Sequence, residues 1–457
     1  MLSVEDFTFY FVADPHYFKS SLGAYGKEYE EFMDFEQKCF AETEAINKAL
    51  FEYLKSAADS NTVLFGGDLS FNGEKESHLE FKKMLCELKE SGKNVYVVTA
   101  GHDIEPHPFC YDGGEKKEVE GISFFDQYDL YRDFGYDGAL SFNKEHLSYI
   151  TPLCDGLRLL VLCNDTEEGT NKAYSDDFLL WIKERLDEAK KDGQKVIAIE
   201  HYPVLPGQPV LQFIPDARQK DAEKLYTLLA DNGVHLIFTG HMHNQSINFV
   251  TTKNGNRFFD VCTGSAIGCP AFFRRVTLKN NFTVAEIESI PVPDFSYDTK
   301  GKSCSVYLKD QFERMILSLL DGMKDDPQRL LSKFGAGDKK ALFGPVKKIG
   351  KIFDTWTVGK TARVFFVKAE KEVKDVKLKA LALDLARYTF EGDQPYTEDT
   401  PMGKTLLKVF KRLNPVFKIL EKKLHGAQGE EINMYDILKN TVGNYGISDY
   451  NATIELE

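Results

Sequence analysis

The sequence lacks any hydrophobic run long enough to cross a membrane. A spanning helix needs about 18 or more consecutive apolar residues, and no stretch of the 457 residues provides them. The N-terminus reads Met-Leu-Ser-Val-Glu-Asp and has no basic segment followed by an apolar one, so it does not resemble a secretory signal peptide. We therefore expect a cytoplasmic protein without a membrane partner.

Closely spaced cysteine pairs and sequence repeats are also missing. The eight cysteines are widely separated and none forms a C-x-x-C pair. This excludes a zinc-finger framework and a thioredoxin-like redox motif, and free thiols at this frequency are ordinary in a reducing compartment. No low-complexity tract or solenoid period is present, which indicates an ordinary globular chain.

Positive charge is scarce in the first two thirds of the chain. Residues 1–300 carry 30 Lys and Arg against 49 Asp and Glu, whereas residues 301–457 carry 27 against 22, and the whole chain has a net charge of −14. An acidic surface repels a phosphate backbone, so we expect no long nucleic acid as partner. The change coincides with a Pro-containing polar stretch at 290–302 and predicts two domains, 1–295 and 303–457.

The periodicity of the first domain alternates between strands and helices. Short buried strands are predicted at 7–13, 62–65, 94–99, 159–162, 196–199 and 235–238, with amphipathic helices between several of them. This rhythm is typical of a layered α/β domain. From 246 to 290, apolar runs separated by Asn-Gly and Lys-Asn-Asn turns predict antiparallel strands that close the sheet. Beyond 303 the pattern is helical throughout, with a break or kink expected at Pro415.

Asp and His residues follow directly after these predicted strands. Taken singly, each is compatible with a turn or a cap. Together they would meet at one edge of the sheet, where ligand sites form in α/β proteins. Carboxylates suit hard cations and imidazoles suit borderline metals, so the cluster predicts a polynuclear metal site. Its members are Asp14, His16, Asp68, His102, Asp103, His201, His241 and His243.

The ordered motifs D-x-H, G-D, H-D, H-x-P and G-H-x-H resemble the calcineurin-like metallophosphoesterase superfamily over about residues 7–290. Residues 261–270 (VCTGSAIGCP) and 160–166 (LVLCNDT) resemble two further segments of that family. Residues 134–161 and the helical C-terminal part resemble bacterial members described as class III cyclic-nucleotide-phosphodiesterase-like. The resemblance implies an α/β fold, a layered metallophosphoesterase sandwich of two β-sheets flanked by helices, plus an all-α C-terminal domain.

The resemblance also implies a binuclear centre with two divalent or trivalent metal ions, such as Mn, Fe or Zn. Asp68 would bridge the two ions. The catalytic histidine would be His102, with Asp103 behind it as an orienting carboxylate. The remaining ligands would be Asp14, His16 and His243 for the first ion and His201 and His241 for the second.

One position departs from the family pattern. The family carries Asn before the catalytic histidine and uses it as a ligand of the second metal, whereas this sequence has Gly101. We expect weak or exchangeable occupancy of the second site. A backbone carbonyl, an extra water or another side chain would have to replace the missing oxygen. The candidate side chains lie near predicted strand ends and are those of Asn72, Asn164, Asp165 and Asn244.

The implied activity is metal-dependent hydrolysis of phosphoesters. A hydroxide bridging the metals would attack phosphorus in line, and His102 would give a proton to the leaving oxygen. Small phosphodiesters such as cyclic nucleotides are favoured, and a phosphomonoesterase is the alternative. A catalytically weak scaffold of the same fold is a further alternative, which Gly101 favours and the six retained ligands oppose, because buried charges are costly to keep together.

The segment from 104 to 139 follows His102 and is rich in aromatic residues. Its side chains could stack on a nucleobase. They could instead form one face of a helix packed on the core, and we favour this interpretation. The residues concerned are Phe124, Phe125, Tyr128 and Tyr131.

Overall fold

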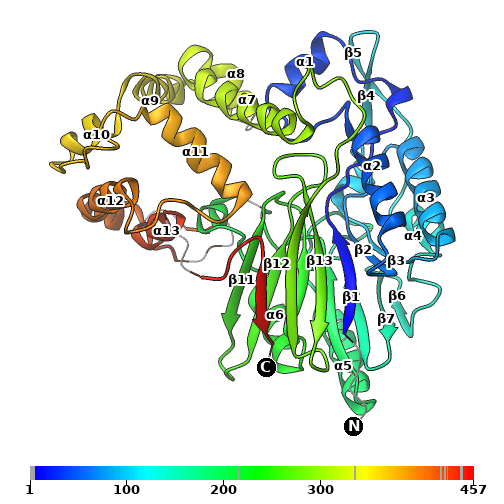
Figure 1. Ribbon diagram of the computed structural model, residues 1–457. Helices are drawn as coiled ribbons and strands as arrows, with labels where there is room; N and C mark the ends of the chain where they lie inside the picture. The colour runs from blue at the N-terminus through cyan, green and yellow to red at the C-terminus, as the bar shows by residue number, and fades with distance from the viewer. Residues whose placement is uncertain are drawn as a thin grey trace.

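Two β-sheets packed face to face form the centre of the molecule (Figure 1). The computed structural model describes residues 6–214, 216–333, 336–422, 425–426, 429, 431–442 and 446–456. The first sheet has the strand order β15-β14-β13-β1-β2-β3, and the second has the order β11-β12-β10-β9-β8-β7-β6. Helices lie against the outer faces, which confirms the predicted layered α/β sandwich.

Parallel strands form one half of the first sheet and antiparallel strands the other half. β1, β2 and β3 run parallel, and β13, β14 and β15 continue antiparallel from β1. The bounds are β1 Phe7–Val12, β2 Thr62–Gly66, β3 Asn94–Val98, β13 Phe272–Lys279, β14 Val284–Pro291 and β15 Ala452–Glu455.

The second sheet has a parallel centre of β8, β9, β10 and β12, with antiparallel strands at both edges. Its bounds are β6 Ser141–Asn143, β7 Ser148–Cys154, β8 Leu157–Leu162, β9 Lys195–Glu200, β10 Leu236–Thr239, β11 Ser246–Thr251 and β12 Arg257–Cys262. A separate hairpin pairs β4 Phe109–Asp112 with β5 Glu115–Glu118.

The core lies between the sheets and beneath the covering helices. Phe9 and Phe11 of β1 meet Phe238 of β10, with ring centroids 5.3 and 5.4 Å apart. On the outside, α2 and α3 pack on the first sheet and α5 and α6 on the second. The helix bounds are α1 Lys27–Met33, α2 Thr43–Ser56, α3 Lys75–Glu90, α4 Asp126–Tyr131, α5 Asp176–Lys191 and α6 Ala222–Asp231.

The antiparallel strands predicted between 246 and 290 exist, but they do not close a single sheet. β11 and β12 join the second sheet, whereas β13 and β14 join the first. Turn signals fix which neighbouring strands form a hairpin, but they do not fix the sheet edge to which the hairpin is added. That choice depends on long-range pairing, such as Phe9 of β1 opposite Val276 of β13.

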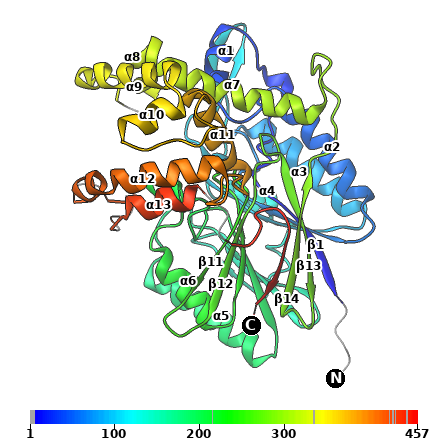
Figure 2. The ribbon, with the colours of Figure 1, turned by 60° about the vertical axis from the view of Figure 1, so that its left-hand side comes forward.

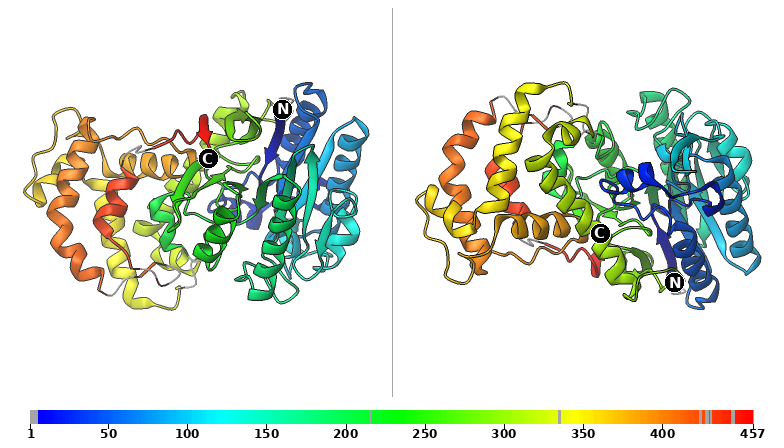
Figure 3. Two further views of the ribbon diagram at one scale, coloured as in Figure 1. Left: turned by 90° about the horizontal axis from the view of Figure 1, so that it is seen from below. Right: turned by 90° about the horizontal axis from the view of Figure 1, so that it is seen from above.

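The C-terminal part is helical, as predicted, and lies to one side of the sheets (Figures 2 and 3). α12 continues through Pro415, so the helix is not broken there. None of the described helices is long and apolar enough to cross a membrane. The bounds are α7 Cys304–Asp325, α8 Pro327–Lys333, α9 Phe343–Thr355, α10 Val358–Val364, α11 Leu378–Glu391, α12 Pro401–Leu420 and α13 Met434–Thr441.

After α13 the chain returns to the first sheet, where β15 pairs with β14. The fully buried guanidinium of Arg274 fixes this return, because its Nη1 donates to the carbonyl oxygens of Asp449 and Tyr450 at 2.8 and 2.9 Å. Its Nη2 donates to the carbonyl of Cys262 at 3.0 Å. The domain boundary predicted between 295 and 303 remains a prediction. The sequence did not predict the final strand, β15.

Candidate metal centre

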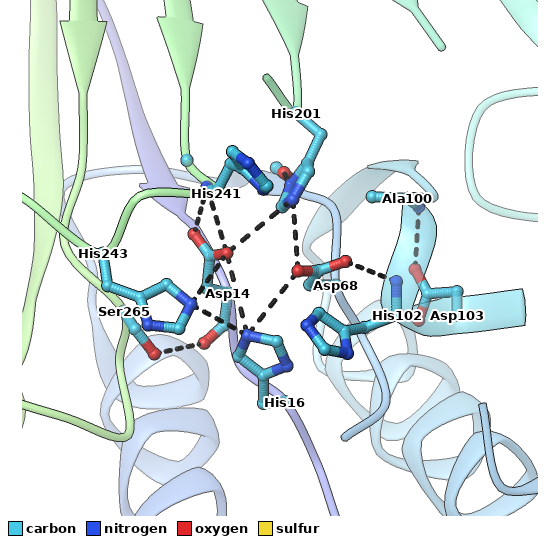
Figure 4. A network of polar contacts seen from close by, with 12 residues as sticks. Asp14, His16, Asp68, Ala100, His102, Asp103, His201, His241, His243 and Ser265 are labelled. Atoms are coloured by element: carbon cyan, nitrogen blue, oxygen red, sulfur yellow. Dashed lines mark hydrogen bonds and ion pairs between the residues drawn. The ribbon is translucent and has the colours of Figure 1, made fainter. Parts of the chain in front are cut away.

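The predicted site residues lie on the loops that follow five strands of the two sheets (Figure 4). β1 and β2 lead to Asp14, His16 and Asp68, and β3 leads to His102. β9 and β10 lead to His201, His241 and His243. Because parallel strands end at one edge of a sheet, packing the two sheets face to face brings both sets of loops together.

The backbone at these residues adopts a conformation that is rare for side chains of this kind. Five of the six predicted metal ligands have positive φ angles, from 37° at His16 to 67° at His241. Left-handed backbone at non-glycine residues costs free energy and clusters at functional sites. The tight turns aim successive side chains at one point. The remaining three ligands with positive φ angles are Asp14, Asp68 and His243.

The first group of donor atoms consists of Asp14, His16 and His243, all buried. The Nε2 atoms of His16 and His243 are 3.0 Å apart, and Oδ1 of Asp14 lies 3.4 Å from Nε2 of His243 and 3.8 Å from that of His16. Two imidazole nitrogens bound tetrahedrally to one zinc at about 2.1 Å would be about 3.4 Å apart, and closer at smaller angles. The spacing therefore fits one shared cation.

The second group consists of Asp68, His201 and His241. Nδ1 of His201 lies 2.8 Å from the carbonyl of Gly66, and Nε2 of His241 lies 2.9 Å from that of Asp216. Such backbone contacts fix the rings and leave the opposite nitrogen for a metal. Nε2 of His201 is buried without a hydrogen-bond partner among the described residues, and it lies 3.1 Å from Asp68. An unpartnered buried nitrogen beside a carboxylate fits a cation.

Asp68 lies between the two groups. Its Oδ2 is 3.1 Å from Nε2 of His201 and 3.6 Å from Nε2 of His16, while its Oδ1 accepts the backbone N–H of His102. Burial alone would raise the pKa of Asp68, but His201 and His102 hold it well below its usual range. Burial lowers the pKa of His201, yet Asp68 raises it to about 10. Both shifts indicate a position where positive charge is stabilised.

The loops that carry the ligands are also tied to each other. The backbone N–H of His241 donates to both carboxylate oxygens of Asp14, and the hydroxyl of Ser265 donates to the carbonyl of Asp14. Gly240 is required here, because a Cβ at this residue would lie 2.3 Å from Oδ2 of Asp14. Through Ser265, the T-G-S segment at 263–265 thus holds the backbone of Asp14 in place.

The structure does not place Asp103 against the ring of His102, as an orienting carboxylate would be. The carboxylate of Asp103 accepts the backbone N–H groups of Ser70 and Ala100 and does not contact the imidazole of His102. It fixes the loop rather than the ring. The carboxylate near the ring is that of Glu105, whose Oε1 lies 3.9 Å from Nδ1 of His102. Sequence analysis did not single out Glu105, because it lies two residues past the motif.

Gly101 is surrounded by atoms that leave no room for a side chain. A Cβ there would lie 2.9 Å from Oη of Tyr202 and 3.2 Å from Cγ2 of Thr170. Of the four candidates for the missing ligand, Asp165 has a buried carboxylate oxygen without a hydrogen-bond partner among the described residues. Burial raises the pKa of Asp165 to about 7, and His201 opposes that shift.

A second candidate, Asn164, donates to the side chains of Asn171 and Gln219. Its amide nitrogen is therefore engaged. Asn244 accepts a contact from the thiol of Cys262 at 3.4 Å, and the backbone of Asn72 donates to Glu74. Asp165 is the one carboxylate among the four, and its unpartnered buried oxygen makes it the strongest candidate.

A pocket of about 540 Å³ opens beside Asp68, His102 and His241. Its volume is in the range of small-molecule sites. None of the four aromatic residues that were considered for stacking on a nucleobase lines it. Phe124 and Tyr131 are buried in the core and Tyr128 packs against it, which confirms the core interpretation for these three, while Phe125 is partly exposed elsewhere.

Residues 7–245 match the family model of the calcineurin-like phosphoesterases. No curated protein sequence matches the chain significantly. Similar solved structures include a dimetal phosphatase from Danio rerio, with 13% identity and a TM-score of 0.45, covering 63% of this chain and 96% of that one. A purple acid phosphatase from yellow lupin has 16% identity, a TM-score of 0.42 and coverage of 64% and 53%.

A third similar structure is the NAD nucleotidase of Haemophilus influenzae, with 14% identity, a TM-score of 0.36 and coverage of 78% and 62%. These structural likenesses are weak. The family model, in contrast, spans more than half of the 457 residues and includes every predicted ligand. The chain therefore belongs to the calcineurin-like phosphoesterases.

Proposed function

We propose that this phosphoesterase acts on small phosphodiesters, with cyclic nucleotides as the first natural class to test. Metal-dependent hydrolysis of phosphoesters is the activity of its family. The substrate preference and the role of each residue are our proposal. The observation that carries it is the charge of the pocket beside the two donor groups.

The pocket wall is acidic. Apart from Asp68, it carries four carboxylate side chains and one amine, and the amine of Lys220 is 3.2 Å from Asp216. A phosphomonoester brings up to two negative charges at neutral pH and a phosphodiester brings one, so the wall repels the monoester more strongly. The charged residues of the wall are Glu105, Glu167, Glu168, Asp216 and Lys220.

The proposed ligands are Asp14, His16 and His243 for one metal ion and His201 and His241 for the other, with Asp68 shared. When bound, two metal ions supply Lewis acidity and a water whose pKa is lowered toward neutrality. Burial lowers the pKa of His16 and His241, which keeps these imidazoles in the neutral form that ligates metals. His102 lines the pocket, and its proposed role is to donate a proton to the leaving oxygen.

Two chromogenic substrates test the proposal. The protein is loaded with Mn, Fe, Zn or Mg and assayed on bis-p-nitrophenyl phosphate and on p-nitrophenyl phosphate, with metal content measured in parallel. We expect faster hydrolysis of the diester. Faster hydrolysis of the monoester would favour a phosphomonoesterase, and metal binding without hydrolysis of either would favour a catalytically weak scaffold.

The acidic wall offers a matched variant pair. Glu167→Gln/Glu168→Gln removes two charges from the pocket, and Glu87→Gln/Glu90→Gln removes two from the distant helix α3. In the pocket variant, hydrolysis of the monoester should improve, so the ratio of the diester rate to the monoester rate should fall. The α3 variant should leave the ratio of the two rates unchanged.

A further inference from the structure

The exposed face of α12 carries cations along its length and aliphatic side chains near its C-terminal end. The helix contains five Lys and Arg and no acidic residue. Val416 and Ile419 are 50% and 65% exposed. Positions spaced i, i+4, i+7, i+8, i+12 and i+15 fall on one side of a helix. The exposed residues at this spacing are Lys404, Lys408, Lys411, Arg412, Val416 and Ile419.

The loop after α10 places an aromatic side chain beside this face. Phe366 is 89% exposed and has a φ angle of 57°, although bulky residues rarely adopt left-handed backbone. Phe366, Val367 and Lys368 form one side of a hollow of about 540 Å³. Lys408, Lys411 and Arg412 of α12 form the other side.

Most cations of this face have no ion-pair partner among the described residues. Lys408 pairs with Glu370 at 2.7 Å. Among the residues that the structure describes, Lys368, Lys411 and Arg412 have no carboxylate within 4.0 Å. The segment from 355 to 369 also contains three cations and no acidic residue. Positive potential is therefore concentrated here, although residues 301–457 as a whole have a small net charge.

We propose that this face, residues 364–368 with the exposed side of α12, docks on the surface of an anionic lipid bilayer. Basic residues near such a surface are attracted to anionic headgroups, and exposed aromatic and aliphatic side chains enter the interface. The face meets both requirements: its cations surround the hollow, and Phe366, Val416 and Ile419 protrude beside them. Figure 1 shows α10 and α12 on the opposite side of the molecule from β1 and β2, whose loops carry Asp14, His16 and Asp68.

This proposal differs from the expectation of no membrane partner. That expectation rested on the absence of a spanning segment, and docking on a surface needs none. The proposal does not depend on the substrate of the enzyme.

Co-sedimentation with lipid vesicles tests the proposal. The full chain is mixed with vesicles of phosphatidylcholine or of an equimolar mixture of phosphatidylcholine and phosphatidylglycerol. We expect binding to the mixed vesicles alone, weakening as salt is added. The variant Lys411→Gln/Arg412→Gln should bind about 30-fold more weakly, because each cation near an anionic surface contributes about a 5-fold factor. Phe366→Ser should weaken binding by about 10-fold.

Matched controls carry the same changes elsewhere. Lys190→Gln/Lys191→Gln removes two exposed cations from α5, and Phe249→Ser removes a phenyl group that is 53% exposed on β11. Both should bind like the unchanged protein. Metal content and the hydrolysis of a soluble diester should be the same in all variants. Vesicle binding is measured independently of hydrolysis, so it tests the docking proposal even if the protein does not hydrolyse the diester.

Three outcomes would overturn the proposal. One is equal binding to neutral and anionic vesicles, or binding to neither. Another is a loss of binding in the control variants as large as in the face variants. The third is a salt-sensitive dimer without lipid that the face variants abolish, because the face would then meet the acidic first domain of a second copy.

Discussion

Replacing Gly101 by Asn, the residue expected from the family, is predicted to destabilise the protein instead of completing the metal site. The new Cβ would lie 2.9 Å from Oη of Tyr202. The Tyr202 ring is buried and packs on two proposed ligands, with centroids 5.0 Å from His201 and 4.4 Å from His241. The ring cannot retreat without moving these ligands.

The expected loss of stability follows from overpacking, which typically costs about 1–3 kcal/mol. The free energy of unfolding of Gly101→Asn, measured by urea denaturation, should fall by about this amount, and metal content should not rise. Gly138→Asn is the matched control, because a Cβ at Gly138 has no atom within 4 Å. Its free energy of unfolding should change by less than about 0.5 kcal/mol.

A second change isolates the contact with the hydroxyl. Tyr202→Phe removes Oη, so Gly101→Ala should cost less in that background than in the unchanged protein, with a coupling of about 0.5–3 kcal/mol. The reasoning would be refuted if Gly101→Asn kept the full stability and raised the metal content to two tightly held ions per chain. The side chain would then fit and serve as the missing ligand.

Four further variants test individual residues. His102→Ala should lower turnover by about 10²–10⁴-fold and leave metal content intact, since the role proposed for this residue is to move a proton and not to bind metal; loss of metal would contradict that role. Asp68→Ala should lose both metal and turnover, because its carboxylate lies between the two groups. Asp165→Ala should lower metal occupancy below that of its neighbour variant Asn164→Ala, and equal occupancy would exclude Asp165 as a ligand. Arg274→Met should lower the free energy of unfolding by about 3 kcal/mol, because three backbone carbonyls lose the guanidinium as a donor, whereas metal content should stay unchanged in the folded protein.

The candidate site could be predicted because its information is local in the sequence. Asp14 and His16 follow β1 within a few residues, and His241 and His243 follow β10 in the same way. A strand ends where its apolar run ends, and parallel strands end at a shared edge. The order of five such motifs along the chain was therefore enough to group their side chains.

The parts that were not predicted depend on contacts between distant segments. β15 is four residues long; it pairs with the edge of β14, and Arg274 binds the carbonyls before it. The contact of Tyr202 with Gly101 depends on how the loop from β9 meets the loop from β3. Neither leaves a local pattern. The distribution of charge on α12 was visible in the sequence, but which of its faces is exposed was not.

The most direct test of the account is a metal titration of the stripped protein. The chelator-treated protein is titrated with Mn²⁺ while bound metal and hydrolysis of bis-p-nitrophenyl phosphate are followed together, with Asp68→Ala as the matched control. The account predicts no activity without metal, two binding events of unequal affinity, and activity that follows the weaker event. Undiminished hydrolysis by the metal-free protein, or by Asp68→Ala, would contradict it.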